Sequence, residues 1–268
     1  MAGLSGCSLV PDLTILKTQY PVVIFVGHKE PPRIRFQKGR PEDWVPFERI
    51  SKTALGAVVV SEDWAFYTHQ GIDTNQLREA IQKDFEEGRF ARGASTITQQ
   101  VVKNVFLERD KTLWRKIKEA YLAVKLEKVI PKRKILEVYF NVAEWGDGIY
   151  GIGPAARHYF NKHPSELTAK EGAFLAALLP SPIRYGQSFR SRQLTPFMRR
   201  QIGSILTKMV QARYLSAEER IAQLGVPLAF EKDRTSVPSS FETPSGLSFD
   251  APSDEESLTD PESAGDNR

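Results

Sequence analysis

The sequence predicts a mainly α-helical fold with a short β-ribbon near its N-terminus. From about residue 50 to about residue 225, apolar residues recur every three or four positions, which is the spacing of one helix face. Short β-prone runs precede that region, at residues 20–26 and 33–36. Hydrophobic residues make up 41% and charged residues 26% of the 268, which excludes a collagen, a low-complexity fibre and a wholly disordered chain.

The β-ribbon is the first predicted element. Its two runs are separated by Gly27, His28 and the pair Pro31-Pro32, residue types that favour a turn over a continuing strand. The ribbon therefore leads into the helical region without belonging to it.

Capping residues mark where the predicted helices begin. Their side-chain oxygens accept hydrogen bonds from the first free backbone N–H groups of a helix. Glu171 and Glu219 each stand three residues after a cap and complete a capping box. The predicted caps are Asp73, Ser95, Thr112, Thr168, Thr195 and Ser216.

The helix after Thr112 has an apolar face. Its members recur at three and four residues before Pro131 ends the helix, and they are Leu113, Ile117, Ala120, Tyr121 and Val124. A further helix then carries Ile135, Leu136 and Tyr139.

Three regions follow from the composition. Residues 1–19 are predicted to be a leader or linker, 20–230 the folded domain, and 234–268 an acidic disordered tail, since that stretch is too poor in apolar residues to offset ordering entropy. Leu4-Ser5-Gly6-Cys7 has the pattern of a bacterial lipobox, but the six residues before the cysteine include no basic one. Either an anchor is truncated there or the match is chance. No apolar run approaches the roughly 20 residues of a membrane span.

The net charge of +4 conceals a strong asymmetry. From Glu242 onward there are 8 acidic residues and one basic residue, which leaves 36 basic and 25 acidic residues in 1–241, a net charge of +11. A body this basic favours nucleic acid, an anionic membrane surface or a phosphorylated substrate. The alternative is a solvated basic surface with no particular partner. The one cysteine, Cys7, excludes an internal disulfide.

The densest group of reactive side chains lies between Glu62 and Gly71, directly after the apolar run 58–60. An acid that follows a buried run can lie at the wall of a cleft, where desolvation raises its pKa and suits it to general acid or base catalysis. The alternative is that Glu62 caps a helix N-terminus and that His69 is a hydrogen-bonded core histidine.

A polar helix start follows at residues 93–100. Backbone N–H groups at a helix N-terminus attract anions, and Lys103 projects from the same face as Gln99, four residues earlier. The alternative is that Ser95 is an ordinary helix cap.

Arg115 and Glu119 are four residues apart, so they meet on one helix face, with Lys116 and Lys118 nearby. One interpretation is an exposed ion pair of little energetic value. The other is that the cations bind a diphosphate beside Glu119. Two carboxylates in different environments and a cation cluster suggest glycosyl transfer from a phosphorylated sugar, because Lys and Arg can stabilise a departing phosphate. Hydrolysis of a plain glycoside does not need that cluster.

Several motifs, in this order, resemble the peptidoglycan glycosyltransferases of glycosyltransferase family 51, and most closely the monofunctional biosynthetic members. The resemblance covers about residues 20–185, with Gly148 to Phe160 similar to the helix after the fourth motif. The motifs are Glu62-Asp63-x-x-Phe66-x-x-His69-x-Gly71, Gly93-x-Ser95-Thr96-Ile97-Thr98-Gln99-Gln100, Arg115-Lys116-x-x-Glu119 and Lys132-x-x-Ile135-Leu136-Glu137-x-Tyr139-x-Asn141.

The resemblance implies a lysozyme-like helical fold with a small mobile lobe beside the membrane. It implies polymerisation of lipid II into glycan strands with release of undecaprenyl diphosphate. Glu62 is then the base that deprotonates the acceptor sugar's 4-hydroxyl, and Glu119 a second acid that assists the donor. The implied substrate-binding residues are Asp63, Ser95, Thr98, Gln99, Gln100, Lys103, Lys111, Arg115 and Lys118.

The implied partners are lipid II, the growing glycan strand, the membrane surface and other cell-wall synthesis proteins, with no nucleic acid. The implied location is the periplasmic or outer face of a bacterial cytoplasmic (inner) membrane. No cofactor is required; some relatives use a divalent cation, Mg or Mn, at the leaving group, and no metal cluster is readable here. Candidates for the membrane-facing lobe are Phe85, Arg89, Phe90 and Arg92, with ordinary loop residues as the alternative.

The sequence departs from the family pattern at three points. Ala94 replaces a usual glycine and is expected to matter little. Lys111 replaces a usual arginine, so a bidentate phosphate contact becomes a point charge and donor binding weakens. The usual N-terminal anchor is not readable, which leaves the mode of attachment open. No transpeptidase domain is expected after Gly225. A lytic hydrolase with Glu62 as general acid, or a non-catalytic scaffold, are the alternative functions.

Overall fold

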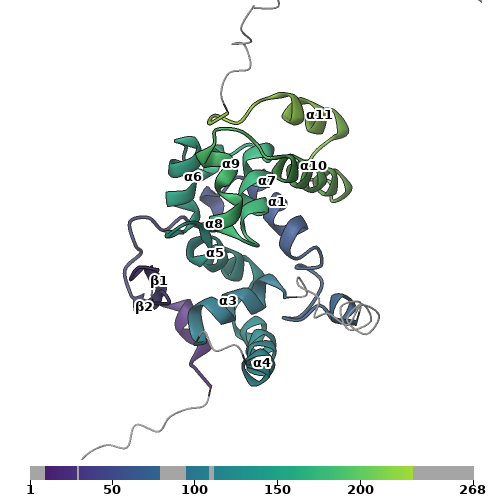
Figure 1. Cartoon of the computed structure of the whole chain (residues 1–268). Helices are drawn as coiled ribbons and strands as arrows, with labels where there is room; N and C mark the ends of the chain where they lie inside the picture. Colours follow the sequence, from purple (N-terminus) through teal and green to yellow (C-terminus); the bar gives the residue numbers. More distant parts are fainter. Residues whose placement is uncertain (1–9, 29, 79–94, 109–111, 232–268) are drawn as a thin grey trace, which may run out of the picture. The chain divides into compact units, whose positions relative to one another are not determined.

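The computed structural model describes residues 10–28, 30–78, 95–108 and 112–231 (Figure 1). These residues form a mainly helical fold with a β-hairpin near the N-terminus, which confirms the predicted class. Residues 74–78 are also helical. The remaining elements are η1 (Leu13–Lys17), β1 (Tyr20–Ile24), β2 (Arg33–Gln37), η2 (Phe47–Arg49), α1 (Lys52–Glu62), α3 (Ile97–Phe106), α4 (Leu113–Val129), α5 (Lys132–Val142), β3 (Glu144–Gly146), β4 (Ile149–Tyr150), α6 (Ile152–Phe160), η3 (Pro164–Glu166), α7 (Ala169–Leu178), α8 (Pro182–Tyr185), α9 (Gln187–Arg190), α10 (Pro196–Gln211) and α11 (Ala217–Gly225).

Helices α1, α7 and α10 pack against one another as the centre of the fold. Every residue of α7 is buried, as expected of a helix that is apolar nearly all round. Gly172 lets α7 approach α1 closely, because a Cβ atom there would lie 2.7 Å from the Cα of Ala54. Residues 54–60 of α1 are buried in this contact, so the C-terminal end of α1 is held firmly.

A second group consists of α3, α4 and α5, with α3 packed against both neighbours. Ile97, Val101 and Val102 form the buried side of α3. The opposite side of this helix is therefore free to carry polar residues.

The N-terminal hairpin pairs Tyr20 with Gln37 and Ile24 with Arg33, and it lies against α5. The segment after it is fixed by two side chains of α5. Asn141 accepts from Val45 N and donates to Val45 O, both at 2.8 Å. Glu137 accepts from the Trp44 indole N–H at 3.0 Å and from Phe47 N at 3.2 Å. Two residues of the fourth motif thus secure the chain that precedes α1.

The predicted helix starts are nearly all confirmed. Thr112, Thr168, Thr195 and Ser216 each accept a backbone hydrogen bond at the start of their helix. Asp73 accepts from the next turn, and the rest of its predicted helix lies outside the described residues. The start predicted at Ser95 is wrong by one position, because Thr96 and Gln99 form the capping box of α3.

The apolar residues noted along α4 do not form its buried face. Leu113 is 76% exposed and Ile117 is 52% exposed, whereas Leu122 and Leu126 are fully buried with Ala123. Both sets recur at three and four residues, so the spacing alone does not select between them. The buried face also contains Glu119, whose charge is paired by neighbouring cations, and a paired charge can be buried at acceptable cost.

The folded region begins before the predicted boundary at Tyr20. Leu13 and Leu16 of η1 are buried, and η1 packs against α4, so this part of the predicted leader belongs to the domain. The predicted tail, residues 234–268, and the predicted lobe residues Phe85 to Arg92 lie outside the described residues. Within the described parts, no helix combines the length and apolarity needed to cross a membrane.

Candidate active site

Glu62 is the last residue of α1, at the end of the buried run 58–60. The alternative that it caps a helix N-terminus is therefore wrong. One of its carboxylate oxygens accepts a hydrogen bond of 2.9 Å from the Gln100 side-chain amide. Burial raises the pKa of Glu62, and this effect outweighs the Gln100 hydrogen bond and the nearby Lys103 charge, which both lower it. The structure thus supplies the raised pKa that the sequence predicts.

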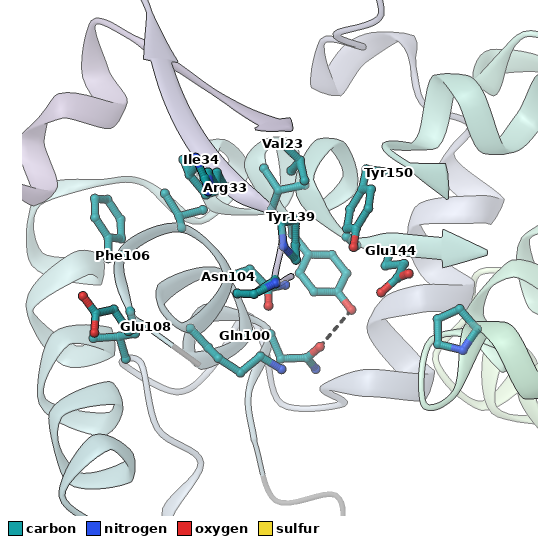
Figure 2. A pocket seen from close by; sticks show the side chains of 18 of the residues that line it. Val23, Arg33, Ile34, Gln100, Asn104, Phe106, Glu108, Tyr139, Glu144 and Tyr150 are labelled. Atoms are coloured by element: carbon teal, nitrogen blue, oxygen red, sulfur yellow. Dashed lines mark hydrogen bonds between the residues drawn. The ribbon is translucent and has the colours of Figure 1, made fainter. Parts of the chain in front are cut away.

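A pocket of about 1030 Å³ opens on the polar side of α3 (Figure 2). Gln100, Lys103 and Asn104 line it from α3, and Tyr139 lines it from α5. Gln100 also hydrogen-bonds Glu62, so the carboxylate lies one side chain away from the pocket. Both β-hairpins contribute to its walls, through Val23, Arg33, Ile34, Glu144 and Tyr150.

Two of the predicted diphosphate-binding cations lie in this pocket. Lys103 reaches it from α3 and Arg115 from α4, whereas Arg33 of the N-terminal hairpin lines it as an ion pair with Glu30 at 2.9 Å. Lys118 does not line it, and Lys111 lies outside the described residues. The structure therefore places Gln100 and two cations around one cavity, with the base candidate Glu62 hydrogen-bonded to Gln100 behind them.

Glu119 is buried and holds two cations of α4. It accepts a hydrogen bond of 2.8 Å from Arg115 and pairs with Lys116, which also donates to the Ser95 hydroxyl at 2.7 Å. With an exposed fraction of 1%, Glu119 does not belong to an exposed ion pair. Its effect is to fix Arg115, which lines the pocket, and to tie Ser95 to α4.

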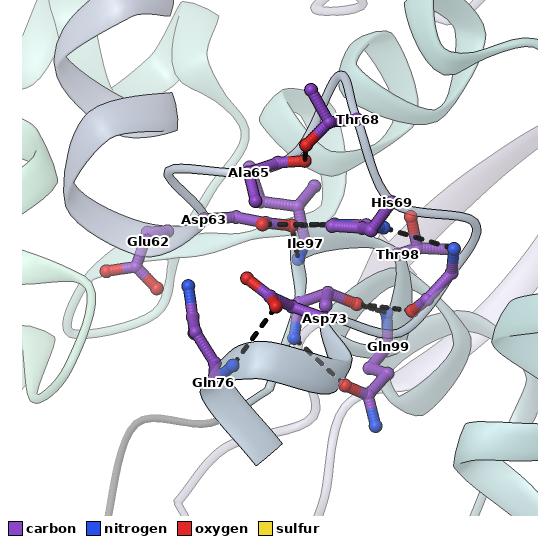
Figure 3. A network of polar contacts seen from close by, with 12 residues as sticks. Glu62, Asp63, Ala65, Thr68, His69, Asp73, Gln76, Ile97, Thr98 and Gln99 are labelled. Carbon is purple, nitrogen blue, oxygen red and sulfur yellow. Dashed lines mark hydrogen bonds and ion pairs between the residues drawn. The ribbon is translucent and has the colours of Figure 1, made fainter. Parts of the chain in front are cut away.

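Asp63 and His69 form a buried network behind Glu62 (Figure 3). Gly71 N donates to His69 Nδ1 at 3.1 Å, which leaves Nε2 as the donor to Asp63 at 2.9 Å. Asp63 also accepts from the first backbone N–H of α3, at Ile97, at 2.9 Å. His69 is thus the hydrogen-bonded core histidine of the second interpretation, and the network joins the end of α1 to the start of α3.

Gly71 completes this junction. Its φ of +92° suits glycine, and a Cβ atom would lie 2.7 Å from the backbone of Ala123 in α4. Its carbonyl accepts a hydrogen bond of 2.7 Å from the Thr96 hydroxyl. The glycine of the first motif is therefore required where two helices meet.

Three predicted substrate-binding residues, Asp63, Thr98 and Gln99, lie behind the pocket wall and do not line it. Thr98 donates to Glu127 at 2.5 Å, and Lys132 pairs with the same carboxylate at 2.8 Å. Gln99 is occupied by its capping box. Their side chains support the elements that form the site.

Sequence reasoning missed several pocket residues. Asn104 stands four residues after Gln100, so helical spacing could have placed it on the same face. Tyr139 lies in the fourth motif, yet nothing in its spacing indicates the pocket. The hairpin residues, such as Arg33 and Tyr150, depend on tertiary packing that no local pattern reveals.

Among the described residues, no group of three or more His, Cys, Asp or Glu side chains is arranged to hold an ion.

The fold and the site define a class of enzyme. A mainly helical domain that places a carboxylate of raised pKa one side chain away from a pocket with Lys and Arg side chains can remove a proton from a hydroxyl and stabilise an anionic leaving group. These are the requirements of glycosyl transfer from a phosphorylated donor.

Comparison with known proteins agrees with this class. A family model described as transglycosylase matches residues 31–210. A protein of Nitrosospira multiformis is 41% identical over 169 residues, which cover 63% of this chain and 72% of that protein. A protein of Dechloromonas aromatica is 39% identical over 206 residues, 72% of this chain and 87% of that protein. Both relatives are named biosynthetic peptidoglycan transglycosylase.

The chain belongs to the transglycosylase family, and it is a glycosyltransferase. The resemblance inferred from the motifs is thereby confirmed, and the helical fold agrees with the lysozyme-like architecture that it implies.

Proposed function

We propose that this protein polymerises lipid II into peptidoglycan glycan strands and releases undecaprenyl diphosphate. The observation that carries the proposal is the Glu62 carboxylate, hydrogen-bonded through Gln100 to the pocket that contains Lys103 and Arg115. The names of the relatives supply the peptidoglycan substrate class.

The proposed reaction assigns one task to each group. Glu62 takes the proton of the acceptor sugar's 4-hydroxyl while that oxygen attacks the anomeric carbon of the donor. The bond between this carbon and the diphosphate oxygen breaks, and Lys103 and Arg115 stabilise the negative charge that develops there. A raised pKa makes Glu62 a stronger base than an exposed glutamate.

Glu119 assists the donor indirectly in this scheme. It pairs with Arg115 and Lys116, so the charge that binds the diphosphate is held in a fixed position before the substrate arrives. A divalent cation at the leaving group and contacts with other cell-wall synthesis proteins stay predictions.

The proposal predicts that Glu62→Gln abolishes polymerisation of lipid II in detergent. A general base contributes about a hundredfold to ten-thousandfold to the rate, so the product should fall below detection while the protein stays folded. Gel analysis of glycan products measures the activity, and circular dichroism checks the fold.

Glu218→Gln is the matched control, because this exposed glutamate lies on α11 and does not line the pocket. It should polymerise lipid II like the wild type. Normal polymerisation by Glu62→Gln would refute the assignment of the base.

A lytic hydrolase is the second candidate function, since a carboxyl of raised pKa can also act as a general acid. Release of glycan fragments from purified cell wall, with no lipid-linked donor present, would favour it. The cations of the pocket favour the transferase, because a plain glycoside has no anionic leaving group.

We also propose that the protein works at the outer, periplasmic face of the bacterial cytoplasmic membrane. A polyprenyl substrate stays in the bilayer, because each buried CH₂ group contributes about 0.8 kcal/mol. The α4 stripe, defined as Leu113, Trp114, Ile117 and Tyr121, is an exposed apolar strip of the kind that inserts into a membrane interface. Lys125 lies over the Tyr121 ring and adds a positive charge that suits anionic lipid.

A further inference from the structure

Tyr139 of α5 connects to the Glu62 carboxylate through one intermediate side chain. Its hydroxyl donates to the Gln100 side-chain oxygen at 3.3 Å, a contact drawn in Figure 2. The amide nitrogen of Gln100 in turn donates to Glu62 at 2.9 Å. Three helices, α5, α3 and α1, therefore meet in a single hydrogen-bonded chain.

Chemistry fixes the direction of both hydrogen bonds. A glutamine amide presents an acceptor oxygen on one side and a donor nitrogen on the other, whereas a carboxylate only accepts. Complete burial raises the pKa of Tyr139 well above its ordinary value, so its hydroxyl keeps the proton that it donates. The Gln100 oxygen must face Tyr139, and its nitrogen must face Glu62.

Other charges around Glu62 come from three elements. Lys103 of α3 and Lys208 of α10 favour the ionised carboxylate, and Asp63, which follows α1, disfavours it. Burial has the largest effect and favours the neutral form. Burial and these charges do not fix the orientation of the carboxylate, whereas the hydrogen bond donated by Gln100 is directional and can do so.

We propose that Tyr139 is a positioning residue that holds the Gln100 amide in the one orientation in which it donates to Glu62. This inference rests on the proposed role of Glu62 as the base. Tyr139 touches neither Glu62 nor a reacting atom in this scheme, so its effect passes entirely through Gln100.

The test is Tyr139→Phe, which removes one hydroxyl and keeps the ring. The Gln100 amide can then rotate and present its oxygen to Glu62, so the hydrogen bond that lowers the pKa of Glu62 is lost for part of the time. Because the carboxylate must be ionised to act as a base, the acid limb of the rate profile should move to higher pH. We expect kcat to fall by up to about tenfold on the acid limb of the profile and less on its plateau, with little change in KM.

Tyr159→Phe is the matched control. Tyr159 is also buried, and its hydroxyl donates to the backbone oxygen of Trp145 at 2.9 Å, outside the pocket. This variant loses the same atom and a comparable hydrogen bond, so it should lower the melting temperature without moving the pH profile. An equal pH shift in both variants would overturn the inference.

A double-mutant cycle separates positioning from packing. In a Gln100→Leu background there is no amide to orient, so adding Tyr139→Phe should change kcat by less than about twofold. If Tyr139→Phe lowers kcat as much in the Gln100→Leu background as it does in the wild type, Tyr139 does not act through Gln100 and the inference is overturned.

A titration that needs no activity completes the test. The full chain with ¹³C-labelled glutamate reports the ionisation of Glu62 by NMR, with Glu62→Gln used to assign the signal. The pKa of Glu62 should be higher in Tyr139→Phe than in the wild type and unchanged in Tyr159→Phe; an unchanged value in Tyr139→Phe would overturn the inference. If the pKa shifts but wild-type protein never polymerises lipid II, the hydrogen-bonded chain is supported and the proposed function fails.

Discussion

Glu62 combines two demands that oppose each other. Its place at the end of a buried apolar helix raises its pKa, which suits a base, but the same burial penalises the charged form that the base requires. Gln100, Lys103 and Lys208 offset part of that cost. The folded state therefore gives up some stability in order to keep a reactive carboxylate near the pocket.

That compromise predicts that Glu62→Gln stabilises the protein at pH 8 and not at pH 4. The folded-state pKa is raised, so the folded protein binds the Glu62 proton more tightly than the unfolded chain does. The destabilising effect of the buried Glu62 charge is absent below the pKa of this group in the unfolded chain, about 4.3, and is complete above its pKa in the folded protein. A neutral glutamine removes it, so denaturant midpoints should rise at pH 8 by a few tenths molar and coincide at pH 4. Equal gains at both pH values would show that the charge is not the cause.

The sequence identifies Glu62 and Arg115 because they stand in motifs whose chemistry is recognisable, and Lys103 because it follows the second motif at helical spacing. It fails for Thr98 and Gln99, because a polar helix start does not reveal which residues turn inward. That choice depends on how α3 packs against α4 and α5, and the packing buries both side chains. The role proposed for Tyr139 depends on three helices meeting, so no local pattern could have shown it.

At the scale of elements, α4 is the helix in which sequence and structure differ most. Its aromatic and aliphatic residues suggest a core face, yet the structure buries the face that contains Glu119 and exposes the α4 stripe. The face that contains Glu119 can be buried because Arg115 and Lys116 neutralise the charge of this acid. The helix thus directs a cation into the pocket and, on another side, an apolar strip to the solvent.

The α4 stripe predicts a defect in membrane binding when it is made polar. Trp114 is 74% exposed and Ile117 is 52% exposed, so Trp114→Ser combined with Ile117→Ser should leave the fold intact. Inserting such side chains into a bilayer contributes about 1.5–3 kcal/mol each when burial is complete, so the double variant should bind anionic vesicles at least about tenfold more weakly. Vesicle co-sedimentation measures the change.

Ile221→Ser provides the control for this experiment. Ile221 is 68% exposed on α11, so the substitution removes a comparable apolar side chain from another surface. Its vesicle binding should match that of the wild type. If both variants bind equally well, the stripe does not contact the membrane.

At the scale of the whole molecule, the helical class, the hairpin and most helix starts follow from the sequence, because caps and periodicity are local signals. The boundaries of the domain do not follow from the sequence. Leu13 and Leu16 stand in a short segment with no periodic pattern, and their burial depends on a distant helix, α4. The hydrogen bonds of Glu137 and Asn141 with residues 44–47 likewise join segments far apart in the chain.

The charge asymmetry of the chain predicts that its acidic C-terminal segment weakens membrane binding. Residues 242–268 bring the net charge from +11 down to +4, so their removal should strengthen binding to anionic vesicles. We expect about tenfold tighter binding at 50 mM salt and little difference at 500 mM, where charges are screened within a few ångströms. Uncharged vesicles serve as the control and should bind both forms equally. Because the deletion leaves the α4 stripe unchanged, a gain that persists at high salt would mean that the segment acts by covering apolar surface and not by its charge.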